Sequence, residues 1–170
     1  MKQLTVYKIL TFIQLPFAVI FGLLAVIMFF VALANPVLLL PVFMMVGFTI
    51  YAICSAIFLF KGITNNQPCK PSLKDWIKVN AYVSSAMGVM TLINTITLMN
   101  TNKAELRKYA EQMLAMQTVK PQGFDADAFI KMMSAMSWGL LAFAGILIIH
   151  LIFTFAFLKK YQHLFGNTVQ

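Results

Sequence analysis

The sequence has few charged residues, and acidic residues are the scarcest of them. Only 11% of its 170 residues are charged, five are Asp or Glu, and 61% are hydrophobic. A soluble domain has roughly 25% charged and about 45–50% apolar residues. So few polar side chains could not cover the apolar surface of this chain in water. We therefore predict an integral membrane protein whose solvent, and first partner, is the lipid bilayer.

Several catalytic patterns are also missing. The sequence has no glycine-rich phosphate-binding motif, no His-Glu-x-x-His motif and no pair of carboxylates within an apolar run. Catalysis needs a positioned acid, base or nucleophile, and ion-coupled transport generally uses carboxylates inside the membrane. We predict that the protein is not an enzyme and that it uses no cofactor.

Cysteine is rare as well. Cys54 lies in an apolar run and Cys69 in a polar segment, so no disulfide is expected between them. Lys70 follows Cys69 directly, and a neighbouring cation can favour a thiolate. The simpler interpretation is an ordinary reduced cysteine.

Positive charge is the one kind that the chain has in excess, with a formal net charge of +8. The lysines form short clusters beside apolar runs. This placement is typical of contacts with anionic lipid headgroups and of control over membrane orientation. We expect no binding of nucleic acid.

Four apolar runs are long enough to span a bilayer, which requires about 20 residues in a helix. The predicted spans are residues 9–34, 37–60, 77–99 and 136–158. The first run is too long for a signal peptide, whose apolar region has about 7–15 residues. The predicted fold is all-α, with four transmembrane helices in an antiparallel bundle that forms one domain over residues 1–170.

Local signals indicate where these helices begin and end. Asn35-Pro36 predicts a turn, so the first two spans should form a tight hairpin. Pro16 predicts either a start or a kink in the first span. Ser72 with Asp75 resembles a capping box ahead of the third span.

The distribution of cations predicts an orientation, because cytoplasmic segments carry more Lys and Arg. The richer side has a single acid, Asp75, and these cations: Lys2, Lys8, Lys61, Lys70, Lys74, Lys78, Lys159 and Lys160. The other side has four acids and these cations: Lys103, Arg107, Lys108, Lys120 and Lys131. We expect a multi-pass protein of the cell (inner) membrane, with both termini and the 61–75 loop in the cytoplasm.

Residues 100–135 form the longest polar segment. Asn102 followed by Glu105 resembles a capping box, and apolar residues then recur at helical spacing. Pro121-Gln122-Gly123 ends this helix, and Asp125 can cap a second helix that continues into the last span. We predict an extramembrane helical hairpin, which either stands upright or lies on the headgroups.

The third span carries a stripe of polar and small residues on one helical face: Asn80, Ser84, Gly88, Thr91 and Thr95, with Asn94 at its border. Small residues let helices approach closely, and hydroxyls and amides can hydrogen-bond between them. The stripe is either a packing seam, which we favour, or a polar pathway for an ion or solute.

His150 is the one ionisable side chain deep within a predicted span. Such a residue is a functional hypothesis, because its burial in lipid is unfavourable. It could relay protons or bind a metal, but no acid or cysteine lies at ligand spacing. We expect instead a hydrogen bond to the third span, to Asn94 or a threonine.

Methionine is unusually frequent in the predicted hairpin, at Met113, Met116, Met132, Met133 and Met136. Thioethers are soft ligands that suit Cu(I). Methionine is also a flexible filler of packing gaps and suits adaptable binding surfaces. We favour the second interpretation.

Three functions follow from these patterns. The leading hypothesis is a non-catalytic membrane subunit or scaffold that binds other membrane proteins. The second is a small channel or transporter, formed by several copies of this chain. The third is a Cu(I)-handling protein that uses the methionines outside the cytoplasm.

Overall fold

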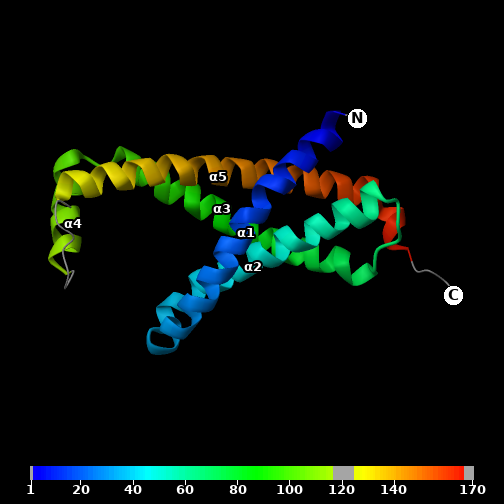
Figure 1. The fold of residues 1–170 in the computed structure, drawn as a ribbon, viewed down its shortest axis with the longest axis horizontal. Coiled ribbons are helices and arrows are strands. Elements are labelled where there is room, and N and C mark those ends of the chain that lie inside the picture. Colours follow the sequence, from blue (N-terminus) through cyan, green and yellow to red (C-terminus); the bar gives the residue numbers. More distant parts are fainter. Residues whose placement is uncertain (1, 117–124, 167–170) are drawn as a thin grey trace. The chain divides into compact units, whose positions relative to one another are not determined.

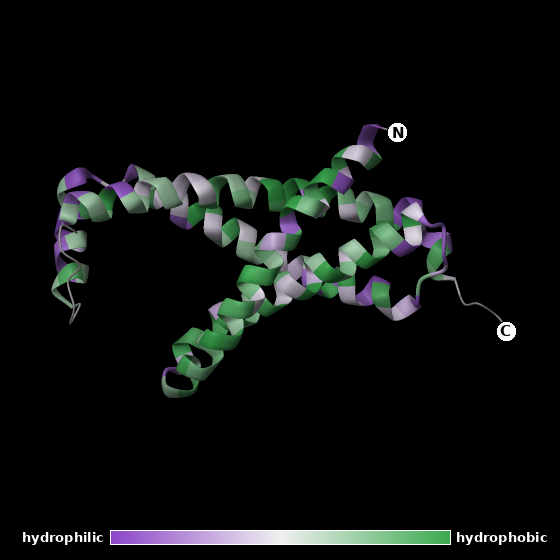
Figure 2. Ribbon diagram, in the orientation of Figure 1, coloured by the Kyte–Doolittle hydropathy of each residue, from purple (hydrophilic) through white to green (hydrophobic). Residues whose placement is uncertain are grey.

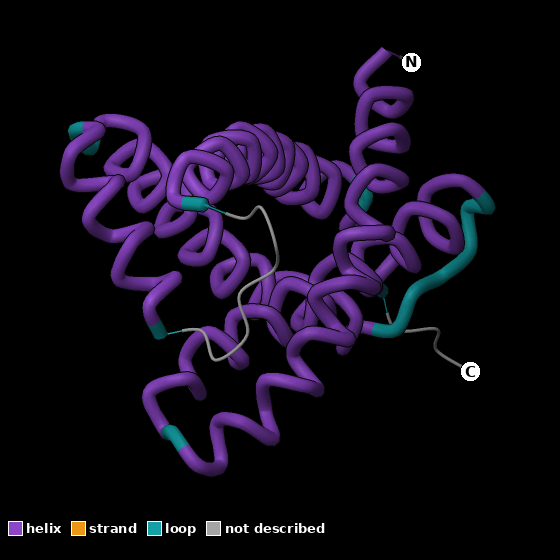
Figure 3. Tube along the Cα trace, turned by 60° about the vertical axis from the view of Figure 1, so that its left-hand side comes forward, coloured by secondary structure: helices purple, strands orange, loops and turns teal. Residues whose placement is uncertain are grey.

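All described secondary structure is helical (Figures 1 and 3). The computed structural model describes residues 2–116 and 125–166. Its long helices are α1 (Lys2–Ala34), α2 (Leu39–Ile57), α3 (Pro71–Asn100), α4 (Lys103–Ala115) and α5 (Ala126–Lys160). Four segments, α1, α2 with its flanking short helices, α3 and α5, are long and apolar enough to cross a membrane. This suggests a multi-pass membrane protein and confirms the all-helical prediction.

The chain forms two compact units. One consists of Met1–Gly88 with Ile146–Gln170, and the other of Val89–Gly145. Helices α3 and α5 each contribute residues to both units. The single domain and the antiparallel bundle of the sequence analysis stay predictions.

The first two apolar helices are joined by a very short connection. Asn35 Oδ1 accepts a hydrogen bond from the Val37 N–H at 3.3 Å and so caps the 3-10 helix η1 (Pro36–Leu38). Pro36 occupies the first position of this helix, where a missing N–H removes no helical hydrogen bond. Helices α1 and α2 therefore form the predicted hairpin, which is hydrophobic along most of its length (Figure 2).

Helix α1 does not begin at Pro16. It starts at Lys2 and runs through this proline to Ala34. Proline inside a helix removes one backbone hydrogen bond, so the first turns need other contacts to stay helical. The fully buried Tyr7 provides such contacts, because its ring packs against Phe157 of α5 at a centroid distance of 5.0 Å.

Helix α3 also begins earlier than predicted. Its first residue is Pro71, so Ser72 lies in the first turn and is not the capping residue. Proline is favoured at the first helical position, since its fixed φ angle suits the helix. The Leu73 N–H donates to the Lys70 carbonyl at 3.0 Å, which closes this first turn.

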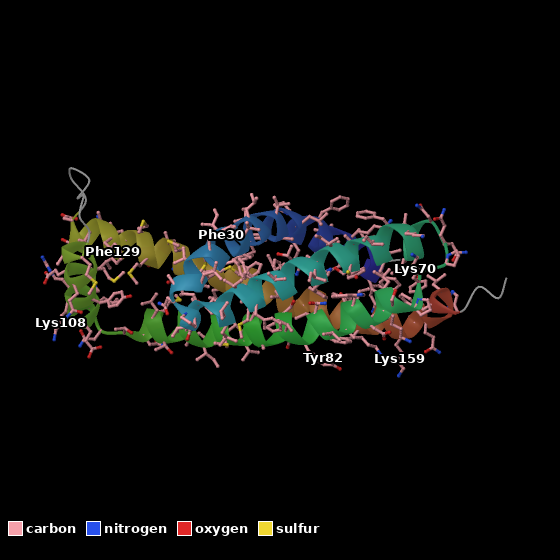
Figure 4. The ribbon with its side chains drawn as sticks, turned by 90° about the horizontal axis from the view of Figure 1, so that it is seen from below. Phe30, Lys70, Tyr82, Lys108, Phe129 and Lys159 are labelled. Carbon is pink, nitrogen blue, oxygen red and sulfur yellow. The ribbon has the colours of Figure 1, made fainter. Side chains whose placement is uncertain are left out.

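One end of the first unit is closed by contacts between the loop before α3 and the C-terminal short helix η3 (Gln162–Phe165). The second apolar segment continues past Phe60 as a π-helix, η2 (Phe58–Thr64). The Cys69 N–H donates to the Leu164 carbonyl at 2.8 Å. Lys70 and Lys159 both lie at this end (Figure 4).

Cys69, whose backbone makes this contact, forms no disulfide and is buried. Burial raises the pKa of its thiol above the ordinary value, and the Lys61 ammonium opposes this only in part. The suggestion that a neighbouring lysine favours the thiolate is therefore wrong, because desolvation outweighs the attraction of the cation.

Glycines allow close approach between helices of the first unit. A Cβ atom on Gly47 of α2 would lie 2.6 Å from Val83 Cγ1 of α3. One on Gly22 of α1 would lie 3.3 Å from Thr49 Cγ2 of α2. Only a residue without a side chain fits at Gly47, so this position fixes how closely α2 and α3 pack.

The second unit is organised by two capped helix starts. Asn102 Oδ1 accepts the Ala104 N–H at 2.6 Å, and Asp125 Oδ1 accepts the Ala128 N–H at 2.8 Å. Both caps were predicted. The two helices share a small apolar core made of Ala110, Leu114, Ala126, Phe129 and Ile130. Phe129 and Lys108 are labelled in Figure 4. The predicted Pro121–Gly123 turn and Lys120 lie outside the described residues.

The close approach at Gly47 generates a test of the fold. We expect Gly47→Ala to lower the free energy of unfolding by about 1–3 kcal/mol, the usual cost of overpacking. Val83→Ala in the same chain should restore much of the loss, because it removes the clashing atom. Thermal unfolding in detergent measures both effects. Gly139→Ala is the control, since nothing lies within 4 Å of that position. Equal losses at both glycines would contradict the interpretation.

Candidate functional site

The first unit buries a group of polar side chains among apolar ones. They come from three helices, α1, α2 and α5, and all have exposed fractions of 1% or less. We call this group the polar layer; its members are Tyr7, Thr11, Gln14, Tyr51, Ser55, His150 and Thr154. Each polar group here needs a hydrogen-bond partner within the protein, because no water reaches it.

Helical spacing brings these side chains to one face of each helix. On α1, Tyr7, Thr11 and Gln14 are separated by four and three residues, which is the repeat of a single helical face. Four residues also separate His150 from Thr154 on α5. The three apolar helices thus turn their polar faces toward one another.

His150 is at the centre of the polar layer. Its Nε2 atom lies 3.0 Å from Thr11 Oγ1 and its Nδ1 atom 2.6 Å from the Tyr51 hydroxyl. The Thr11 hydroxyl donates its only hydrogen to the Tyr7 carbonyl at 2.8 Å. Nε2 therefore donates to Thr11, and in a neutral imidazole Nδ1 then accepts from Tyr51. For a neutral histidine, this pattern corresponds to the Nε2–H tautomer.

Thr154 joins the same network from the next turn of α5. Its Oγ1 lies 2.9 Å from the Tyr51 hydroxyl and 3.3 Å from the Tyr7 hydroxyl. The Tyr7 ring stacks on the His150 ring at a centroid distance of 4.9 Å with an interplanar angle of 19°. Ring stacking and hydrogen bonds together hold the imidazole in a single orientation.

This geometry limits what His150 can do chemically. A metal ligand needs a free nitrogen lone pair, and the one lone pair of neutral His150 accepts the Tyr51 hydrogen bond. No carboxylate is among the hydrogen-bond partners of the polar layer in the described part of the chain. The predicted partner on the third span is wrong, because the partners are Thr11 of α1 and Tyr51 of α2. The arrangement ties α1, α2 and α5 together.

Gln14 differs from the other members. Its side chain is 1% exposed, and neither its oxygen nor its nitrogen has a hydrogen-bond partner among the described residues. An amide buried in this way lowers stability by roughly 1–3 kcal/mol. The polar side chains that contact His150 therefore have hydrogen-bond partners, whereas Gln14, about one turn further along α1, has none among the described residues.

The polar stripe of α3 is divided between the two units. In the first unit, Ser84 is buried and its hydroxyl donates to the Asn80 carbonyl at 2.7 Å, while the Asn80 amide donates to the Trp76 carbonyl. Gly88 is buried and faces Leu147 of α5. Thr91, Asn94 and Thr95 belong to the second unit, where Thr95 is buried and Asn94 is exposed. The seam and the pathway both stay predictions.

The methionines that suggested a copper site all lie in the second unit. Met113 and Met116 are exposed on or just after α4, and Met132 and Met136 are exposed on α5. Met133 is half-buried and lines a hollow between helices α3, α4 and α5. The Cu(I) site stays a prediction.

A second candidate site is a groove between α1 and α2, which we call the hairpin groove. It has a volume of about 320 Å³ and an almost entirely apolar lining. Ala25 and Val42 are its most buried lining residues, and Phe30 and Val46 are exposed at its rim. Figure 4 shows Phe30 on this hairpin. Sequence patterns did not indicate the groove, because every residue in it belongs to an apolar run.

Comparison with protein-family models, curated proteins and solved structures gives no match. The function must therefore be argued from the chemistry of these sites.

The bonding around His150 generates a prediction for Tyr51→Phe. The change removes the hydroxyl that donates to Nδ1 and contacts Thr154, while it keeps the aromatic ring. We expect a loss of about 1 kcal/mol in the free energy of unfolding, since hydrogen bonds between membrane helices average roughly 0.6 and reach about 1.7 kcal/mol. Thermal unfolding in lipid nanodiscs provides the measurement. Tyr82→Phe serves as the control, because Tyr82 is exposed. If the two variants unfolded at the same temperature, the Tyr51 hydroxyl would have no structural role.

Proposed function

We propose that this protein is a non-catalytic membrane subunit or scaffold, which binds other membrane proteins through the hairpin groove. The groove is the observation that supports the proposal. Helices associate in lipid through close packing, and small residues at the contact let the two backbones approach. Gly22 and Ala25 are small lining residues that leave room in the groove, and Phe29 and Phe30 line it as well. A transmembrane helix of a partner protein is the occupant we propose.

Two further features agree with a non-catalytic protein that has an outside contact. Most of the apolar stretch of α1 is not buried within the chain, so this helix has surface that can face lipid or a partner. The polar groups around His150 bond to one another, which leaves them unavailable for a reaction. The alternative of a homo-oligomeric channel has less support, because the side chains of Asn80 and Ser84 donate hydrogen bonds to backbone carbonyls of their own helix.

We also propose an orientation in the cell (inner) membrane with both termini in the cytoplasm. Tyr7 near the start of α1 contacts Phe157 near the end of α5, so these two helix ends lie together. Lysines gather there, and cytoplasmic ends carry more Lys and Arg. Alkaline phosphatase is active only outside the cytoplasm, so a fusion to the C-terminus should be inactive and a green fluorescent protein fusion bright. The reverse result would contradict the orientation.

Photocrosslinking in native membranes tests the groove. A benzophenone amino acid at Phe30 or at Val46, on opposite sides of the groove, should give an adduct of one discrete mass. The same amino acid at Ile152 is the control, because that position is 65% exposed on α5 and outside the groove. Val46→Trp should fill the groove from its rim and abolish the adduct formed at Phe30.

The identity of the adduct decides between the hypotheses. A different membrane protein, recovered from Phe30 and lost in Val46→Trp, supports the subunit proposal. Native mass spectrometry of the gently extracted protein should then show the same complex. An adduct between two copies of this chain favours the channel alternative. Adducts with lipid only, or equal adducts at Ile152, contradict the proposal.

A further inference from the structure

The second unit contains two adjoining hollows that the proposed function does not use. One has a volume of about 300 Å³ and the other of about 500 Å³. Both are lined by Leu98, Thr101, Leu106 and Met133, so they share a common wall. Ligand sites in proteins typically have about 300–1,000 Å³, and each hollow lies in that range. We call the pair the corner pocket, because α3, α4 and α5 all contribute to it.

The lining of the corner pocket has an apolar part and a polar part. Leu98, Leu106 and Met133 form an apolar strip that continues from one hollow into the other. The smaller hollow adds Lys103 and two serines, Ser134 and Ser137. The larger hollow adds Glu105 and Tyr109. A ligand that matches this lining has an apolar chain and a polar head.

The charges determine which head fits. Lys103 is exposed, and the one ion pair in the described part of the chain, Arg107–Glu111, leaves it without an acidic partner. Lys103 also lies in the first turn of α4, where the helix dipole favours an anion. Glu105 would repel an anion, but it lines only the larger hollow. We propose that the corner pocket binds an acyl chain with an anionic headgroup, with its head at Lys103 and its chain along Leu98, Leu106 and Met133.

The position of the pocket along the helices agrees with this ligand. Leu98 and Met99 belong to the last turns of α3, at the end of an apolar segment. Trp138 follows Ser137 on α5 and is 60% exposed. Tryptophan is enriched at the boundary between membrane and water. The inference rests on the proposed membrane insertion, which would place the pocket at the level where acyl chains meet their headgroups.

Photolabelling of the purified full chain in nanodiscs of zwitterionic lipid tests the proposal. The probe is palmitate with a diazirine on its chain. We expect adducts on peptides from residues 94–109 or 130–137. Unlabelled palmitate should compete, whereas hexadecanol, with the same chain and no charge, should compete far less. Competition by phosphatidylglycerol identifies a phospholipid headgroup as the natural source of the anion, and competition by palmitate alone identifies a free fatty acid.

Two variants separate the roles of charge and shape. Lys103→Gln should weaken competition by palmitate about fivefold, as expected for one partly exposed charge pair. Lys108→Gln on the same helix is the matched control and should have no effect. Met133→Trp should fill both hollows and remove the adduct. If that variant unfolds, Lys103→Gln still decides the question.

The outcomes also separate this proposal from the proposed function. Adducts elsewhere in the chain, equal competition by hexadecanol, or an unchanged affinity in Lys103→Gln would overturn it. No partner protein is present in the nanodiscs, so a positive result stands even if crosslinking at the hairpin groove fails. A negative result leaves the groove proposal intact.

Discussion

A neutral imidazole that is shielded from water needs a donor at one nitrogen and an acceptor at the other. His150 satisfies this requirement with two side chains from two different helices, Tyr51 and Thr11. Each of these hydroxyls needs a second partner in turn, which Thr154 and the Tyr7 carbonyl provide. The positions of α1, α2 and α5 relative to one another are therefore linked by directional bonds. Apolar packing alone lacks this directional preference, since one apolar side chain can replace another.

Close approaches at two glycines add to the packing of the first unit. Gly47 lets α3 approach α2, and Gly22 lets α1 approach Thr49 of α2. Thr49 donates mainly to its own helix, at 2.9 Å to the Met45 carbonyl, and lies 3.3 Å from the Ala18 carbonyl of α1. The Thr49 hydroxyl thus bonds mainly within its own helix. No member of the polar layer lines the hairpin groove, and this lining is almost entirely apolar.

The long apolar runs and two of the three expected caps could be predicted from the sequence, because they depend on local chemistry, whereas the cap expected at Ser72 was wrong. The confirmed caps are those at Asn102 and Asp125. Pairing between helices was harder to predict. Tyr7, Thr11 and Gln14 repeat at helical spacing on α1, but α3 has a longer polar stripe, so the sequence favoured α3 as the partner of His150. Several of those α3 groups bond to their own backbone, which residue spacing alone does not reveal. The π-helix η2 and both candidate pockets depend on tertiary packing and leave no local pattern.

The origin of His150 in the last long helix has a consequence for biosynthesis. A ribosome makes α1 and α2 well before it reaches residue 150, so Tyr7, Thr11 and Tyr51 are synthesised before the histidine that they contact in the folded chain. Contacts between α1 and α2 can already form at that stage, among them the contact of Thr49 with the Ala18 carbonyl. The polar layer can form only after α5 has been made, so a chain truncated before α5 leaves the Tyr7 and Tyr51 hydroxyls without their partners on that helix.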